Sequence, residues 1–150
     1  GYVQFLTPIL EVVQKNAKAK AKGLDYGCGP SPVLAIMLNE KGFETGYYDP
    51  FFFPEGLQIK KSYDFITCTE AAEHFFEPHK ELTQIFSLLK PEGFLVVMTE
   101  QFTEKIDIDN WYYSRDPSHV CFYTKESLEW IAQHFMRRLE ILDHRTAIFS

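Results

Sequence analysis

The stretch Leu24 to Leu38, LDYGCGPSPVLAIML, decides the fold of this 150-residue chain. Its apolar entry runs into Gly27 and Gly29, and Pro30-Ser31-Pro32 then turns the chain into an apolar segment typical of a buried helix. A strand, a glycine loop and a helix in this order open a nucleotide-type βαβ unit, whose ligand lies at the helix N-terminus. The glycines suit such a loop because the missing Cβ permits a tight turn and a close approach of the ligand. We therefore predict an α/β fold.

The residues around the glycine loop indicate which ligand it takes. A dinucleotide loop follows the pattern G-x-G-x-x-G, but Pro32 stands at the third glycine position. Asp25 lies two residues before Gly27, where a carboxylate would repel a pyrophosphate and attract an ammonium group. The helix N-terminus in turn attracts a carboxylate. A ligand with an amino acid moiety, such as S-adenosylmethionine, carries both charges.

Three segments resemble one known family in their residues and in their order. LDYGCGPSP resembles the first motif of class I S-adenosylmethionine-dependent methyltransferases, D-x-G-x-G-x-G, but departs from it where Ser31 is followed by Pro32. TEAAEH at 69–74 resembles the segment after the family's fourth strand, and LLKPEGFLVV at 88–97 resembles the turn into its fifth. The resemblance implies a Rossmann-like, doubly wound sheet, mostly parallel with an antiparallel C-terminal hairpin. It also implies methyl transfer from S-adenosylmethionine.

Further cofactor contacts are expected where the other strands end. Asp49 closes the strand predicted at 43–48, about 20 residues past the glycines, where such folds bind ribose hydroxyls. A carboxylate can accept both hydroxyl protons, although an Asp-Pro turn is the alternative interpretation. Residues 67–70 leave the sheet at the carboxyl edge, which is the ligand side. The predicted cofactor-binding residues are Asp25, Gly27, Cys28, Gly29, Asp49, Pro50, Phe51, Thr67, Cys68, Thr69 and Glu70.

The third α/β unit is abbreviated. Only 13 residues, 50–62, separate Asp49 from the strand that begins at Tyr63. A helical crossover alone needs about a dozen residues, so we expect a loop and a brief strand at 57–59. Methyltransferases of this class usually carry an acid after the third strand that contacts adenine, and the sequence has no clear counterpart. We therefore expect stacking against Phe51 to hold the adenine.

The remaining elements follow from hydrophobic periodicity and from turn residues. We predict a covering helix within residues 1–22, a helix from Pro78 with Leu82, Ile85, Phe86 and Leu89 on one face, and a helix capped by Thr124. The other predicted elements are a helix at 33–41, strands at 63–68 and 94–99, and a terminal hairpin of 138–142 with 146–149.

Residues 100–123 form a long aromatic insertion without a helical period, which we expect on the substrate side of the pocket. The DPSHV segment at 116–120 resembles a substrate-side loop of small-molecule methyltransferases. His119 is the preferred candidate for a base because histidine titrates near neutral pH, but its ring could instead bond a backbone carbonyl and fix the loop. His74 is the second candidate, with a structural or capping role favoured. The rings of Trp111, Tyr112, Tyr113 and Tyr123 could hold the sulfonium or could simply pack.

Composition limits the possible partners and compartments. The net charge of −6 argues against a general nucleic-acid binder. Neither a membrane-length apolar run nor a signal-peptide pattern is found. Cys28, Cys68 and Cys121 lack metal-type spacing, so we predict reduced thiols, a cytoplasmic protein and no metal site. The length fits one domain, and the abrupt start at Gly1 suggests that the chain begins inside a longer protein.

Together these observations predict an S-adenosylmethionine-dependent methyltransferase that acts on a small organic acceptor. Two alternatives stay open. A non-catalytic S-adenosylmethionine-binding module of the same fold is supported by the Ser31-Pro32 departure and by the short third unit. An NAD-dependent enzyme is disfavoured by Asp25 and by the missing third glycine.

Overall fold

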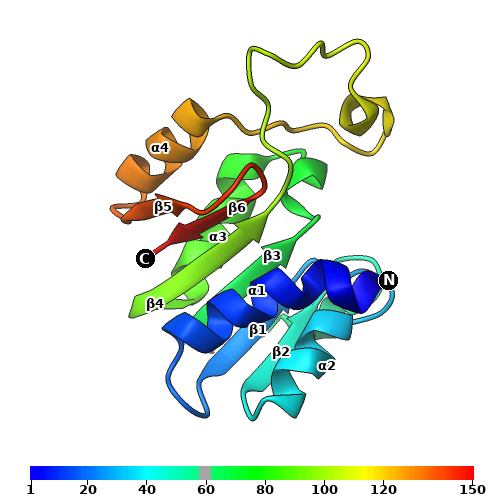
Figure 1. Ribbon diagram of the computed structural model, residues 1–150. Coiled ribbons are helices and arrows are strands. Elements are labelled where there is room, and N and C mark those ends of the chain that lie inside the picture. Colours follow the sequence, from blue (N-terminus) through cyan, green and yellow to red (C-terminus); the bar gives the residue numbers. More distant parts are fainter. Residues whose placement is uncertain (58–61) are drawn as a thin grey trace.

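A six-stranded sheet forms the centre of the computed structural model, which describes residues 1–57 and 62–150 (Figure 1). The strand order is β2-β1-β3-β4-β6-β5. The first four strands are parallel, whereas β6 runs antiparallel to both β4 and β5. This arrangement confirms the predicted sheet and its C-terminal hairpin. The strands are β1 (Lys22–Tyr26), β2 (Glu44–Tyr48), β3 (Tyr63–Thr69), β4 (Leu89–Met98), β5 (Leu139–Ile141) and β6 (Thr146–Phe149).

Helices cover both faces of the sheet, as a doubly wound fold requires (Figure 1). Alternate residues of a strand point to opposite faces, so Phe65 and Ile66 of β3 belong to two separate hydrophobic clusters. The first cluster is covered by α1 (Tyr2–Asn16) and α2 (Val33–Glu40). The second is covered by α3 (Pro78–Leu88) and α4 (Lys125–His134). The predicted covering helix therefore packs on the sheet, through Leu6, Ile9, Leu10 and Val13.

The prediction that Leu89 lies on a helix face is wrong. Helix α3 ends at Leu88, and Leu89 is already extended and pairs with Tyr63. Pro91 drives Lys90 out of the helical region, so the helix has to end before that residue, and the pairing with Tyr63 places its end at Leu88. Strand β4 consequently begins at Leu89 rather than at Phe94, with a register shift opposite Tyr63 and Phe65.

The short third unit contains a single 3-10 turn, η1 (Pro54–Gly56), in its described part. Leu57 is not in a strand, and residues 58 and 59 of the predicted strand 57–59 lie outside the described residues. Elsewhere the boundaries shift little. Helix α2 ends one residue earlier than predicted, and Gly42, with φ of 89°, provides the expected stop.

The capping residue predicted for the last helix is confirmed. The Thr124 hydroxyl accepts a hydrogen bond from the Ser127 backbone N–H at 3.1 Å, and such a cap stabilises a helix by about 1 kcal/mol. Two further 3-10 turns, η2 (Ala72–His74) and η3 (Tyr112–Arg115), flank the site described below. Within the described part of the chain, every helix falls short of the length and apolarity that a bilayer crossing needs.

Candidate functional site

The carboxyl ends of β1 and β3 lie side by side at the point where the strand order reverses. Open α/β sheets bind ligands in the crevice at this point. A cavity of about 600 Å³ opens here. Its walls come from the glycine loop, the turn after β2, the start of α3 and the segment after β3, and they comprise Tyr26, Gly27, Gly29, Asp49, Pro50, Phe51, Phe52, Glu70, Ala71, His74, Phe75, Phe76, Glu77, Glu81 and Ser118.

The glycine loop is held against the end of β2 by backbone hydrogen bonds. The N–H groups of Gly27 and Cys28 both donate to the Tyr48 carbonyl, at 2.8 and 3.1 Å. Gly27 and Gly29 have φ of 81° and 66°, in the left-handed region that favours glycine. A Cβ at Gly27 would lie 2.5 Å from the Ala71 Cβ, so the loop also packs tightly against the segment after β3. The loop forms even though Ser31 and Pro32 replace the family's third glycine.

Asp49 fixes the turn that forms the neighbouring wall. One carboxylate oxygen accepts from the N–H groups of Phe51 and Phe52, at 2.9 and 3.1 Å. The other accepts from Gly29 N–H at 3.0 Å and so joins the turn to the glycine loop. The ribose contact and the Asp-Pro turn, the two interpretations of Asp49, are both compatible with this geometry, since Asp49 fixes the turn and also lines the cavity. Phe51 and Phe52 are exposed, with Phe51 at 87%.

Asp25 lies beneath the glycine loop and does not line the larger cavity. It borders a small recess shared with Tyr2, Cys28 and Thr69. Burial raises the pKa of the Asp25 carboxyl to about 6, against the hydrogen bond from the Thr67 hydroxyl at 2.9 Å. Burial likewise raises the pKa of the Cys28 thiol to about 12. The predicted ammonium contact of Asp25 would have to be made through this recess.

Two predicted cofactor contacts need correction. Thr67 and Cys68 are 0% and 1% exposed, which leaves them no surface for a ligand. Both lie within β3, before the chain leaves the sheet. The Thr67 hydroxyl instead supports Asp25, and Cys68 belongs to the hydrophobic cluster under α3.

Glu70 marks the point where the chain leaves β3. It has φ of 48°, uncommon for a residue other than glycine, and its N–H donates to the Met98 carbonyl at 2.8 Å. Its Oε1 is buried and has no hydrogen-bond partner among the described residues. Burial first, and then the neighbouring Glu73, raise the pKa of the Glu70 carboxyl to about 7. A strained backbone and an orphaned polar atom on a cavity wall are features of ligand-binding positions.

Sequence patterns missed the wall formed by α3. The Tyr26 hydroxyl donates to the Glu81 carboxylate at 2.5 Å, and burial raises the pKa of this phenol. Phe75 and Phe76 add apolar surface to the same wall. The one available signal was the position of Tyr26 directly before Gly27, at the end of a strand already expected to meet the ligand.

The two candidate histidines lie next to each other, 45 positions apart in sequence. Their ring centroids are 4.8 Å apart. Nδ1 of His74 lies 2.9 Å from the Ser118 carbonyl oxygen, and Nδ1 of His119 lies 2.7 Å from that of Tyr113. The His74 residue lines the cavity, whereas His119 stands behind it. The structural role weighed for each ring, a bond to a backbone carbonyl, is thus present in both.

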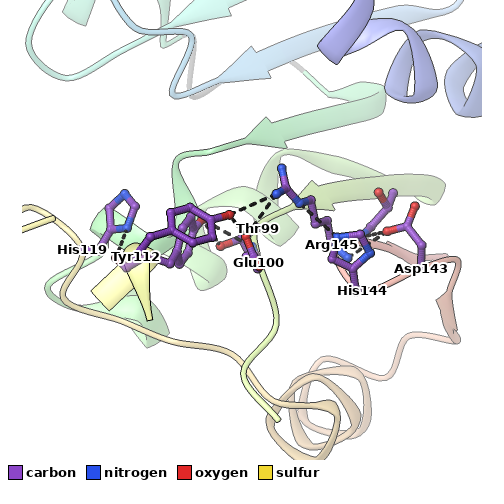
Figure 2. A network of polar contacts seen from close by, with 9 residues as sticks. Thr99, Glu100, Tyr112, His119, Asp143, His144 and Arg145 are labelled. Carbon is purple, nitrogen blue, oxygen red and sulfur yellow. Dashed lines mark hydrogen bonds and ion pairs between the residues drawn. The ribbon is translucent and has the colours of Figure 1, made fainter. Parts of the chain in front are cut away.

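The base of the insertion 100–123 is tied to the sheet by polar side chains (Figure 2). Arg145, in the turn between β5 and β6, donates to the Glu100 carboxylate at 3.2 Å and to the Tyr112 hydroxyl at 3.1 Å. Tyr112 also donates to Glu100. The other rings of the insertion do not line the cavity and pack against one another, namely Trp111, Tyr113 and Phe122, with Tyr123 buried in the core.

A second cavity, of about 680 Å³, lies at the opposite edge of the sheet, among Lys22, Glu44 and Ser62. None of the predicted site residues lines it. The ligand side of the sheet is the carboxyl edge, so we place the candidate site there.

A family profile and a curated relative both identify the chain as similar to methyltransferases. A family profile described as a methyltransferase domain matches residues 3–135. A ubiquinone biosynthesis O-methyltransferase of Cronobacter sakazakii is 31% identical over 91 residues, which are 61% of this chain and 37% of that protein. The chain therefore spans little more than a third of the length of this curated relative.

Solved structures share the fold at low sequence identity. The PH0226 protein of Pyrococcus horikoshii superimposes with a TM-score of 0.73 at 14% identity, over 99% of this chain and 91% of that one. A Burkholderia thailandensis 1,6-didemethyltoxoflavin-N1-methyltransferase, solved with 1,6-didemethyltoxoflavin and S-adenosylhomocysteine, gives 0.71 at 12% identity, over 96% and 76%.

Proposed function

Because this chain belongs to the methyltransferase domain family, we propose that it transfers a methyl group from S-adenosylmethionine to a small organic acceptor. The observation that carries the proposal is the cavity at the carboxyl edge, with the glycine loop and Asp49 on one wall. The relative from Cronobacter sakazakii is named an O-methyltransferase, and the Burkholderia thailandensis structure holds S-adenosylhomocysteine and a small heterocycle. These names support the cofactor and the size class of the acceptor.

The residues present fit this cofactor. A Cβ at Gly29 would meet nothing within 4 Å, so the loop backbone is open to a ligand. The orphaned, buried Oε1 of Glu70 offers an acceptor for a polar or cationic group. Asp49 has its carboxylate on the cavity wall, and Phe51 and Phe52 present exposed rings beside it. The described lining residues include the acids Asp49, Glu70, Glu77 and Glu81 but no lysine or arginine, so the walls favour a cation such as a sulfonium.

We assign the residues as follows. Residues 27–29 would hold the amino acid end of the cofactor, with Asp25 acting through the recess beneath them. Asp49 would accept from the ribose hydroxyls while it keeps its backbone bonds. Phe51 would stack on the adenine, because the abbreviated third unit supplies no acid for that ring.

The bound cofactor supplies an activated methyl group on a positively charged sulfur. The methyl carbon passes to the acceptor atom as the carbon–sulfur bond breaks, its electron pair stays on sulfur, and the acceptor loses one proton. The protein contributes by aligning the two reactants and excluding water. His74 lines the cavity and His119 stands behind it, so one of these rings would take the proton where the acceptor must lose it.

Calorimetry and a product assay test the proposal. S-adenosylmethionine should bind with saturation and NAD should not, because Asp25 and Pro32 disfavour a pyrophosphate. Binding of NAD alone would favour the nicotinamide alternative. Formation of S-adenosylhomocysteine with any member of a panel of small phenols, amines and thiols would establish catalysis. Binding without turnover across the panel would favour the non-catalytic module.

The role of His119 has its own test in the same assay. If it is the base, His119→Ala should lower the maximal rate by about 100-fold or more while cofactor affinity stays near that of the wild type. If it only orders the insertion, the variant should lose thermal stability and raise the Michaelis constant of the acceptor. Wild-type turnover in a stable variant would reject both roles.

A further inference from the structure

Three side chains of metal-ligand type meet beside the cavity: Glu73, His74 and His119. Their candidate donor atoms all lie within 4.8 Å of one another. Backbone hydrogen bonds bring these residues together. The N–H groups of Val120 and Cys121 both donate to the Glu73 carbonyl, at 2.8 and 3.0 Å. The C-terminal part of the insertion is thus hydrogen-bonded directly to η2.

The two imidazoles are oriented as metal ligands are. In each ring Nδ1 faces a backbone carbonyl oxygen, which can only accept, so Nδ1 carries the proton. The lone pair of a neutral ring then resides on Nε2. Nε2 of His119 lies 3.8 Å from the Asp116 carboxylate, too far for a hydrogen bond. A carbonyl that fixes the tautomer and leaves the other nitrogen free is the usual support of a metal-binding histidine.

Glu73 supplies an independent observation. It is 0% exposed, and its Oε2 accepts from the Thr99 hydroxyl at 2.9 Å. Its Oε1 is buried and has no hydrogen-bond partner among the described residues. An unpaired carboxylate oxygen in the interior is costly unless a cation or a donor satisfies it. Glu73 belongs to the same cluster as the two histidines, so a metal ion held between them would satisfy this oxygen.

We propose that Glu73, His74 and His119 bind one divalent first-row transition metal ion, such as Mn²⁺ or Zn²⁺, at the edge of the cavity. Two imidazoles and one carboxylate suit these ions better than Mg²⁺ or Ca²⁺, which prefer oxygen ligands. Glu70 adds a second carboxylate, three residues before Glu73, that lines the same cavity as His74. Three protein ligands leave coordination positions open for a water or for a substrate atom.

The catalytic consequence deepens the proposed function and rests on it. A metal ion next to the cavity would bind a hydroxyl oxygen of the acceptor and lower its pKa. The hydroxyl proton would pass to solvent, the oxygen would attack the methyl carbon, and the carbon–sulfur electron pair would remain on sulfur. His74 and His119 would then serve as ligands rather than as a base. The acceptor class would accordingly be a hydroxyl compound.

Calorimetric titration of chelator-treated protein with MnCl₂ and with ZnCl₂ tests the site without cofactor or acceptor. We expect one equivalent to bind the wild type, and we expect Glu73→Gln and His119→Ala to weaken binding at least tenfold. Glu73→Gln is nearly isosteric, and its amide oxygen can still accept from Thr99. The matched control is His134→Ala, because His79 and His134 form an exposed pair with their Nε2 atoms 3.3 Å apart. Its affinity should equal that of the wild type.

Thermal unfolding of each variant shows whether it is folded, and a bound ion should raise the melting temperature of the wild type and of His134→Ala, but much less that of Glu73→Gln or His119→Ala. Absence of saturable binding, unchanged affinity in Glu73→Gln, or loss of binding in His134→Ala would overturn the site. Since this readout needs no methyl transfer, it fails independently of the proposed function. A protein that binds Mn²⁺ but not S-adenosylmethionine would retain the metal site and lose the proposed activity.

Discussion

The two sides of the cavity are built by different means. The glycine-loop wall, residues 27–29 and 49–52, is held by backbone N–H groups, two on the Tyr48 carbonyl and three on the Asp49 carboxylate. The insertion wall, residues 72–74 and 113–121, reaches the cavity through His74 and Ser118 and is held largely by contacts between distant segments, such as that of His74 with Ser118, 44 positions apart. The first wall thus depends on backbone groups and on a single side chain, Asp49, so it can keep one cofactor while the second is free to adapt to an acceptor.

Gly27→Ala should give the largest effect and tests how rigid the glycine-loop wall is. An alanine there combines a left-handed backbone with a Cβ placed 2.5 Å from the Ala71 Cβ. Together, strain and overpacking should lower the free energy of unfolding by about 3 kcal/mol and abolish measurable cofactor binding. Urea unfolding and calorimetry with S-adenosylmethionine measure the two consequences.

Gly29→Ala is the matched control. Its φ of 66° imposes a similar backbone cost, but its Cβ would meet nothing within 4 Å. The expected loss is therefore only about 1–2 kcal/mol. Equal losses in the two variants would mean that contact between the loop and the segment after β3 is not what makes this wall rigid.

The pH dependence of stability tests the buried carboxylate under the same wall. The pKa of Asp25 is about 6 in the folded protein against an ordinary 3.8, so between these values the folded state holds a proton that the unfolded state has released. Stability from this group is complete below pH 4 and is lost as pH rises through 6, by about 3 kcal/mol. Asp25→Asn should abolish that loss, because the amide is neutral and can still accept from Thr67.

The measurement is the difference in unfolding free energy between wild type and variant from pH 4 to 7. Cys28 and Tyr2 also face Asp25, but their pKa values are raised, so they stay neutral in this range. Asp64→Asn is the control, since hydrogen bonds from Lys90 and Lys22 outweigh desolvation and lower the pKa of Asp64 below its ordinary 3.8, so its difference should stay flat from pH 4 to 7. A flat difference for Asp25→Asn would contradict the burial of a titrating carboxyl.

The glycine-loop wall could be predicted because its signals are local. Left-handed glycines, an Asp-Pro turn and a β-strand followed by an apolar helix each occupy a few consecutive residues. The strands and the terminal hairpin followed from similar local patterns, whereas the doubly wound order of the sheet followed from the family resemblance. Leu89 was misplaced because its spacing from Leu82 and Ile85 continues the helical period, and only the pairing with Tyr63 places it in a strand.

The insertion wall could not be predicted in the same way. Glu73 and His119 are brought together by hydrogen bonds from Val120 and Cys121 to the Glu73 carbonyl, and no short pattern encodes that return of the chain. For the same reason, the spacing of Glu73, His74 and His119 along the sequence does not match any usual metal-binding motif. The burial of Thr67 and Cys68 was also missed, because a strand end marks the ligand edge only to within a few residues.

Asp49→Ala should give an intermediate effect and separates the two interpretations of that residue. Loss of its charged hydrogen bonds should weaken S-adenosylmethionine binding by about 1–3 kcal/mol, roughly 5- to 150-fold. Asp49→Asn keeps an acceptor for one backbone group but loses the bidentate carboxylate. If the role is the turn alone, the variants should lose stability while the affinity of the remaining folded protein stays unchanged. That outcome, read by calorimetry, would remove the ribose assignment.

Arg145→Met should give the smallest effect and tests whether the two walls are independent. The variant removes the ion pair with Glu100 and the hydrogen bond to Tyr112, which tie the insertion to the turn before β6 (Figure 2). The methionine keeps an apolar stem over the Phe5 ring, which the guanidinium approaches to 5.9 Å. Because the pair is only partly buried, stability should fall by about 1 kcal/mol or less.

The more informative readout compares the affinity for the cofactor with the Michaelis constant of the acceptor. Loosening the insertion should raise the Michaelis constant of the acceptor severalfold, whereas the affinity for S-adenosylmethionine should not change, since no contact of Arg145 reaches residues 27–29 or 49–52 among the described residues. Lys125→Met, which breaks an exposed pair with Glu129 away from the cavity, is the control and should alter neither quantity. An equal fall in both affinities would show that the insertion and the turn before β6 support the cofactor side of the cavity as well, because Arg145 acts on Glu70 of the cavity wall only through its charge.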